Sequence, residues 1–241
     1  MLDAHNITYE DEGLSFVGYI AFPATLTQPT PAILIIHDWS GRNEFACEQA
    51  RKIADLGYIG FAVDMFGKGM VGTTTESKMK LMRPLMDDRN IIKKRMLKAL
   101  EVVKGLDHVD QQHIVAMGFC FGGLCCLDLA RTGADLAGVV SFHGLLTAPD
   151  IDNQGPILAK ILALHGYQDK MVTPDQVIAF GNEMLKRQAD WQLNMFGNAM
   201  HGFTNPQAHD EAAGILYNKE AATQAWRAMQ LFLNEIFDKR V

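Results

Sequence analysis

The chain has 241 residues, of which 48% are hydrophobic and 21% charged, and its formal net charge is −6 at pH 7. This length can bury a large core without disulfides or metals, and the composition is that of a folded rather than a disordered protein. The negative charge provides no broad basic surface, so neither nucleic acid nor a membrane is an expected partner.

Three features bear on the location of the protein. The longest apolar runs, such as residues 32–36, are far shorter than the roughly 20 residues of a membrane-spanning helix. The first six residues have neither a basic start nor an apolar core, so no signal peptide is visible. Four cysteines, two of them adjacent, do not form a disulfide framework. We therefore expect a cytoplasmic protein that is a monomer or a small homo-oligomer.

Short apolar segments alternate with segments of helical spacing from the N-terminus onward. Antiparallel strands are expected near Ile7 and over residues 14–22. A fully apolar strand over 32–36 follows, then a helix over 44–56 that Gly57 ends, and another buried strand over 59–65. Residues 66–95 fit neither pattern and predict a lid or a decorated crossover insertion.

The same alternation continues to the C-terminus. The expected elements are a helix over 91–103, a strand over 114–117, a helix from Leu124, strands over 136–142 and 161–164, a helix over 174–186 with Thr173 as N-cap, a strand over 191–196 and a helix over 219–237. Buried strands that alternate with helices predict an α/β fold, a doubly wound and mostly parallel sheet in a single domain over 1–241.

One strand-to-helix turn carries a candidate nucleophile. The strand over 114–117 runs into Gly118-Phe119-Cys120-Phe121-Gly122-Gly123, which is the nucleophile-elbow pattern G-x-C-x-G with cysteine in the serine position. The glycines permit a sharp turn that exposes the sulfur near free N–H groups at the helix start. The motif alone does not distinguish this nucleophile from a buried structural cysteine.

Two later residues favour the nucleophile. Asp169 follows the strand over 161–164, and His201 follows the strand over 191–196. Nucleophile, acid and histidine in that order, each past the carboxyl end of its own strand, are the chain order of an α/β-hydrolase triad. Loops at these strand ends converge on one crevice. We therefore predict an α/β-hydrolase fold with the triad Cys120, Asp169 and His201.

From about residue 7 to the last helix, the chain resembles the dienelactone hydrolase family. The matching motifs are the elbow at 118–123, His-Gly-Tyr-Gln-Asp at 165–169, Met-His-Gly-Phe at 200–203, His-Asp-Trp-Ser-Gly at 37–41 and Val-Asp-Met-Phe-Gly at 63–67. The resemblance implies that the backbone N–H groups of Phe121 and Trp39 form the oxyanion hole. It also implies that Asp38, where the family often has glutamate, holds the resting cysteine; a solvated loop acid is the alternative.

The resemblance implies an acyl-thioester mechanism in which Cys120 is the nucleophile, His201 the base and acid, and Asp169 the group that orients the imidazole. Because thiolate is itself a good leaving group, cysteine favours esters with stabilised leaving groups, such as enol lactones. Dienelactone hydrolases bind a substrate carboxylate with two arginines, one of them a few residues past the histidine, and residues 202–206 here contain none. Dienelactone is therefore not the expected natural substrate.

The expected substrate pocket is defined less sharply than the triad. Lys78, Arg83 and Arg89 lie in the region of the other family arginine, with surface charge as the alternative role. Trp39, His143 and Phe203 are candidates for an apolar pocket wall, and packing at a strand end is the alternative for His143.

Taken together, the sequence predicts a carboxylic ester hydrolase of small esters or lactones, with carboxymethylenebutenolidase-type chemistry and no cofactor. The absence of an H-E-x-x-H motif and of paired C-x-x-C motifs speaks against a metal site. A thioesterase or acyltransferase that uses the same triad is the first alternative. The second is a redox-sensing protein with an oxidisable Cys120, which would not need the acid and the histidine.

Overall fold

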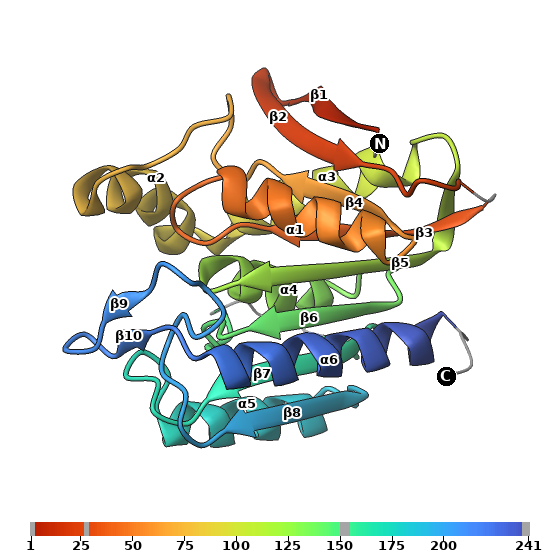
Figure 1. The fold of residues 1–241 in the computed structure, drawn as a ribbon. Coiled ribbons are helices and arrows are strands. Elements are labelled where there is room, and N and C mark those ends of the chain that lie inside the picture. The colour runs from red at the N-terminus through yellow and green to blue at the C-terminus, as the bar shows by residue number, and fades with distance from the viewer. Residues whose placement is uncertain (1–2, 27–28, 150–154, 238–241) are drawn as a thin grey trace. The chain divides into compact units, whose positions relative to one another are not determined.

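The structure is a computed structural model that describes residues 3–26, 29–149 and 155–237 (Figure 1). The chain divides into two compact units, Met1–Met117 and Gly118–Val241. The division falls inside strand β5 (Val109–Phe119), so each unit is described below by itself. The expected single domain over residues 1–241 stays a prediction.

The first unit is built on a mixed sheet. Its other strands are β1 (Ala4–Asp11), β2 (Leu14–Ala21), β3 (Thr30–Ile36) and β4 (Ile59–Val63), and the strand order is β1-β2-β4-β3-β5. Strand β2 pairs antiparallel with β1 and β4, whereas β3 and β4 are parallel. The predicted antiparallel N-terminal strands are therefore confirmed.

The parallel strands of this unit form its core. Every residue of β4 is buried, and so are all but one of β3, which explains their nearly continuous apolar sequences. Helix α1 (Glu44–Asp55) packs closely on β4. Glycine at position 60 permits this approach, because a Cβ atom there would lie 2.3 Å from the carbonyl oxygen of Ala50. Gly57 follows the helix with a φ of +89°, as its predicted role at the helix end requires.

Most of the atypical segment 66–95 is helical. It contains α2 (Thr75–Asp87) and the start of α3 (Arg89–Lys104), and Asp88 lies between the two helices. A capping box between Thr74 and Ser77 begins α2, in which Leu85 is the one buried residue. The sequence analysis did not predict this helix, and it contains Pro84, a residue that ordinarily breaks a helix.

The second unit contains three parallel strands and three helices. The strands β6 (Gly138–Phe142), β7 (Lys160–Gly166) and β8 (Trp191–Phe196) lie in the order β6-β7-β8. The helices are α4 (Phe121–Arg131), α5 (Pro174–Lys186) and α6 (Lys219–Ile236), with α6 on the near face of these strands and α5 on the far face in Figure 1. The predicted helix 174–186 and strand 191–196 are confirmed at both ends.

Several elements of this unit differ from the expectation. Strand β6 begins at Gly138 rather than at residue 136, and β7 covers Lys160–Gly166 rather than 161–164. Helix α4 begins at Phe121 rather than at Leu124. A small antiparallel pair, β9 (His209–Asp210) and β10 (Ile215–Leu216), was not predicted. Strands of two residues are too short to show an alternating pattern in sequence.

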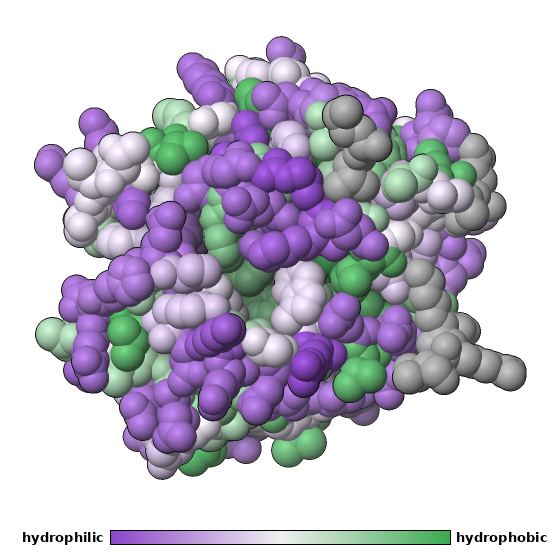
Figure 2. Space-filling view, in the orientation of Figure 1, coloured by the Kyte–Doolittle hydropathy of each residue, from purple (hydrophilic) through white to green (hydrophobic). Residues whose placement is uncertain are grey.

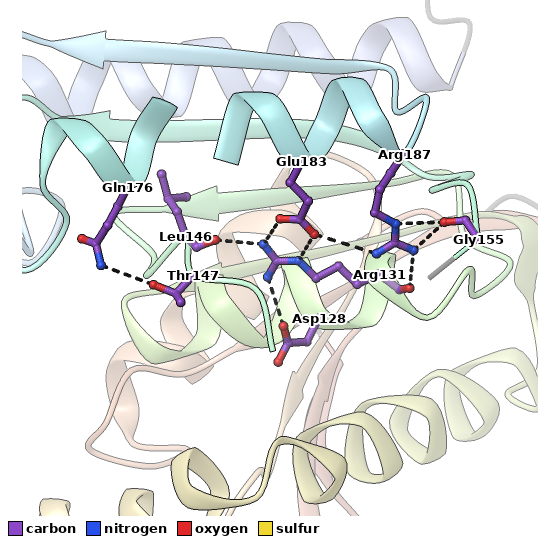
Figure 3. A network of polar contacts seen from close by, with 8 residues as sticks. All are labelled: Asp128, Arg131, Leu146, Thr147, Gly155, Gln176, Glu183 and Arg187. Atoms are coloured by element: carbon purple, nitrogen blue, oxygen red, sulfur yellow. Dashed lines mark hydrogen bonds and ion pairs between the residues drawn. The ribbon is translucent and has the colours of Figure 1, made fainter. Parts of the chain in front are cut away.

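A buried network of charged side chains joins α4 to α5 (Figure 3). Arg131 donates hydrogen bonds to both carboxylate oxygens of Glu183, at 2.7 and 2.9 Å, and one to Asp128 at 3.1 Å. Arg187 donates to the carbonyl oxygens of Arg131 and Gly155 at 2.8 and 2.7 Å. The network fixes the C-terminal end of the helix that starts at the candidate nucleophile.

No helix in the part of the chain that the structure describes is long and apolar enough to cross a bilayer. The face of the molecule in Figure 2 is mostly hydrophilic, with hydrophobic residues scattered over it.

Candidate active site

The predicted elbow has the geometry of a strained turn. Cys120 is the N-cap of α4 and has a φ of +54°, a value that a side chain other than glycine rarely adopts. A Cβ atom at Gly118 would lie 2.2 Å from the carbonyl oxygen of Gly122, so only glycine fits there. The N–H of Cys120 donates to the carbonyl oxygen of Phe142 at 3.0 Å, which ties the turn to the end of β6.

The structure brings Cys120, His201 and Asp169 together. The Nε2 atom of His201 lies 3.0 Å from Sγ of Cys120, and its Nδ1 atom lies 2.8 Å from Oδ2 of Asp169. The side chains of Asp169 and His201 are buried, whereas Cys120 is partly exposed. A nucleophile that solvent can reach, a base within hydrogen-bond reach of it and a buried orienting acid are the arrangement of a catalytic triad.

Main-chain contacts hold the acid in place. Oδ1 of Asp169 accepts hydrogen bonds from the N–H groups of Met171 and Val172, at 2.7 and 3.3 Å, and this leaves Oδ2 for His201. At the end of β7, a Cβ atom at Gly166 would lie 2.6 Å from the carbonyl oxygen of Ala199. The acid loop and the histidine loop can therefore pack this closely only with glycine at position 166.

The main chain of His201 is held on both sides by the segment that contains β9 and β10. Its N–H donates to the carbonyl oxygen of Gly214 at 3.0 Å, and its own carbonyl oxygen accepts the N–H of Leu216 at 3.1 Å. These two bonds fix the point from which the imidazole projects. The unpredicted strand pair thus supports the histidine loop.

The electrostatics of the site favour a protonated imidazole. Burial by itself would lower the pKa of His201. The negative charge of Cys120 and the hydrogen bond to Asp169 outweigh it and raise the pKa from 6.5 to about 10. At neutral pH the site therefore favours an imidazolium beside the cysteine sulfur.

The residues predicted for the oxyanion hole and the resting state lie in different parts of the chain. Phe121 is the first residue of α4, where main-chain N–H groups point out of the helix end. Asp38 and Trp39 belong to the first unit, in the loop after β3. The Asp38 carboxylate accepts the N–H of Ser40 at 2.8 Å. Their predicted roles toward Cys120 stay predictions.

The predicted basic residues lie on or beside α2. The ammonium nitrogen of Lys78 is 5.2 Å from the centre of the Trp39 ring, within cation–π range. Arg83 is 75% exposed and forms an ion pair with Asp87 at 3.5 Å. Lys78 thus contacts Trp39, a predicted site residue, whereas Arg83 is an exposed side chain whose ion pair lies on the surface.

The two predicted pocket residues of the second unit are buried beside the triad. His143 is 2% exposed, and Phe203, which is fully buried, packs against its ring with centroids 5.3 Å apart. Two further residues of this cluster were missed by the sequence analysis. Thr204 lies 2.7 Å from Nε2 of His143, and His165 is buried at the end of β7. His165 belongs to the quoted motif 165–169, and Thr204 directly follows the quoted motif 200–203.

Within the described residues, no group of three or more histidine, cysteine, aspartate or glutamate side chains is placed to hold a metal ion.

Comparison with known proteins places this geometry in a family. The model of the dienelactone hydrolase family matches residues 16–237. A putative carboxymethylenebutenolidase of Aquifex aeolicus is 27% identical over 91% of this chain and 93% of its own length. A probable 2-oxo-3-(5-oxofuran-2-ylidene)propanoate lactonase of Bradyrhizobium is 25% identical over 92% of this chain and 90% of its own length.

Solved structures agree with the sequence relatives. The dienelactone hydrolase-like promiscuous phosphotriesterase P91, from metagenomic libraries, superposes with a TM-score of 0.93 at 33% identity, with 98% of each chain covered. This likeness confirms the predicted α/β-hydrolase fold. The chain therefore belongs to the dienelactone hydrolase family and is a hydrolase that acts on esters or lactones.

Proposed function

We propose that the protein hydrolyses small activated esters or lactones with Cys120 as nucleophile, His201 as acid and base, and Asp169 as the orienting carboxylate. The observation that carries this proposal is the continuous contact from Oδ2 of Asp169 through the imidazole to Sγ of Cys120, with distances of 2.8 and 3.0 Å. The strained elbow supports it, because backbone strain persists where the surrounding structure enforces it and is common at active sites.

The reaction begins with attack of the Cys120 thiolate on the ester carbonyl carbon. The carbonyl π electrons move to the oxygen, and the N–H of Phe121, the first residue of α4, is the proposed donor that stabilises this oxygen. As the tetrahedral adduct collapses, the bond to the leaving oxygen breaks, and protonated His201 transfers its Nε2 proton to that oxygen. The products of this half-reaction are an alcohol or enol and an acyl-thioester at Cys120.

The second half-reaction regenerates the enzyme. His201, now neutral, takes a proton from a water molecule as the water oxygen attacks the thioester carbonyl. The carbon–sulfur bond then breaks, sulfur leaves as thiolate, and the carboxylic acid is released. Asp169 stabilises the imidazolium that forms in this step and keeps Nε2 directed at the reacting atoms.

The leaving group determines the preferred substrate class. A thiolate leaves more readily than an ordinary alkoxide, so an adduct of a simple alkyl ester mostly reverts to substrate. An enol lactone or an aryl ester avoids this reversal, because its leaving oxygen is a stabilised anion. The Bradyrhizobium relative is named as a lactonase of an oxofuranylidene propanoate, which is such an enol lactone and carries a carboxylate.

For substrates that carry a carboxylate, Lys78 is the basic side chain that the contacts favour. Its ammonium group lies over Trp39, whose N–H is the second proposed oxyanion donor. Arg83, already paired with Asp87, is the weaker candidate. Asp38 is proposed as the group that holds Cys120 before substrate arrives.

Selective alkylation tests the nucleophile. One equivalent of iodoacetamide is expected to label Cys120 and to abolish hydrolysis of p-nitrophenyl acetate. Cys47, Cys125 and Cys126 are buried and serve as internal controls for selectivity. Full turnover after labelling of Cys120, or in Cys120→Ala, would refute the proposal.

A substrate panel tests the proposed class. Enol lactones, aryl esters and alkyl esters, each with and without a carboxylate, are expected to rank by leaving-group stability. Lys78→Ala is expected to raise KM for the carboxylate members alone, with Arg83→Ala as the matched control. Equal rates for alkyl and enol esters would contradict the leaving-group argument.

A further inference from the structure

His143, directly after β6, has no part in the proton transfers described above. Its φ is +39°, in the left-handed region that residues other than glycine seldom adopt. The strained residue is held by its neighbours. Its N–H donates to the carbonyl oxygen of Leu164 at 2.8 Å, and the preceding carbonyl, of Phe142, accepts the N–H of Cys120 at 3.0 Å. In this backbone conformation the side chain of His143 lies against the imidazole of His201.

The ring of His143 packs on the imidazole of His201. The two ring centroids are 5.3 Å apart and the planes are inclined by 66°, an edge-to-face contact. Nε2 of His143 lies 2.7 Å from Oγ1 of Thr204, which belongs to the same segment as His201. Phe203 also makes an edge-to-face contact with the His143 ring, with centroids 5.3 Å apart. The hydrogen bond to Thr204 therefore fastens the His143 ring beside His201.

The His143 ring is neutral. Burial lowers its pKa well below 6.5, and the positive charges of His201 and of His165 would lower it further. His165 is itself kept neutral, because burial lowers its pKa as well. Nδ1 of His143 is buried, and among the described residues it has no hydrogen-bond partner outside its own residue. A neutral ring packs against His201 without charge repulsion, whether or not His201 carries a proton.

The need for this contact changes during the reaction. In the free enzyme both ring nitrogens of His201 are held, one by Asp169 and one by Cys120. Acylation removes the charge and the hydrogen-bonding role of the sulfur, so Nε2 loses its partner. The ring then has one hydrogen bond, to Asp169, and a single bond permits it to pivot. The contact with His143 does not involve the sulfur and survives acylation.

We propose that His143, fastened by Thr204, is a positioning residue that keeps the His201 imidazole in line with the attacking water during hydrolysis of the acyl-enzyme. The inference rests on the proposed function. It predicts that loss of the His143–Thr204 bond slows deacylation much more than acylation, because Cys120 itself holds His201 during acylation.

Single-turnover kinetics with p-nitrophenyl acetate separate the two steps. Release of p-nitrophenolate reports acylation, and the acetyl adduct on Cys120, measured by mass spectrometry of quenched samples, reports deacylation. Thr204→Val keeps the side-chain shape and removes the hydroxyl, and His143→Phe keeps a packed ring and removes the hydrogen bond. Both are expected to prolong the adduct by about tenfold to a hundredfold, the scale of a misplaced catalytic group. Thr204→Ser, which retains the hydroxyl, is expected to restore the wild-type lifetime.

An adduct lifetime equal to that of the wild type in both Thr204→Val and His143→Phe would overturn the inference. Equal slowing of both steps would also overturn it, because loss of packing alone would have that effect. Hydrolysis by Cys120→Ala at the wild-type rate would instead refute the proposed function. The two failures are therefore distinguishable.

Discussion

The buried charge network between α4 and α5 allows a quantitative test of stability. The guanidinium of Arg131 is 3% exposed and the carboxylate of Glu183 is 15% exposed, and two hydrogen bonds join them. Glu183→Gln keeps the shape of the side chain and removes its charge. The network then contains Arg131 and Arg187 against the single carboxylate of Asp128.

The expected loss of stability is large because a buried cation keeps its desolvation cost when its partner is removed. Breaking a buried pair in this way costs about 3–5 kcal/mol. In a chain of this length, each kcal/mol lowers Tm by roughly 2–4 °C, so Tm is expected to fall by roughly 6–20 °C. Arg83→Gln is the matched control, because its ion pair with Asp87 is exposed on both sides and is expected to change stability by less than about 1 kcal/mol.

Urea unfolding followed by circular dichroism, with the midpoint and slope fitted separately, measures both variants. Arg131→Met, Glu183→Leu and the combination of the two form a double-mutant cycle, in which the pair is expected to show coupling above about 1 kcal/mol. A Glu183→Gln variant as stable as the Arg83→Gln control would refute the reasoning, because it would mean that the buried network carries no net penalty when broken.

Three further predictions concern the triad. Gly118→Ala places a Cβ atom 2.2 Å from the carbonyl oxygen of Gly122, so we expect loss of both stability and hydrolysis, and an active, stable variant would contradict the elbow geometry. His201→Ala is expected to lower kcat by about 10³-fold or more, measured with an aryl ester, and a wild-type kcat would exclude His201 as the base. The raised pKa of His201 also links protonation to folding. Because the folded state holds the proton on His201 more tightly than the unfolded chain does, protonation stabilises the folded state. This contribution is complete below pH 6.5, the pKa of an ordinary histidine, and is lost as the pH rises toward about 10. The urea midpoint is therefore expected to fall more steeply between pH 7 and pH 10 in the wild type than in His201→Gln, and parallel curves would contradict the assigned shift.

Much of the fold could be predicted because its elements carry local signals. The helix Pro174–Lys186 begins with a Thr173 capping box and a proline in its first turn, and its bounds were predicted at both ends. The strands β3 and β4 have nearly continuous apolar sequences because they are buried on both faces, and this pattern can be recognised without coordinates. The motif order of Cys120, Asp169 and His201 likewise identified three residues that the structure brings into contact.

Other elements could not be predicted, because their cause lies elsewhere in the chain. Helix α2 contains Pro84, a residue that ordinarily breaks a helix, and it forms where this segment packs against α3. The strands β9 and β10 are two residues each and form where the chain returns to the main chain of His201. Helix α4 starts at Phe121, three residues earlier than expected, because the strained turn at Cys120 is already its cap.

The sequence by itself determined the class of fold and singled out the three residues of the proposed triad, since periodicity and motif spacing are properties of neighbours along the chain. Only the tertiary structure decided that the left-handed His143 meets Thr204 and His201, and that Arg131 is buried against Glu183. These contacts join residues far apart in sequence, and their energies depend on desolvation and on partner geometry. Desolvation and partner geometry are both set only when distant segments of the chain pack against each other.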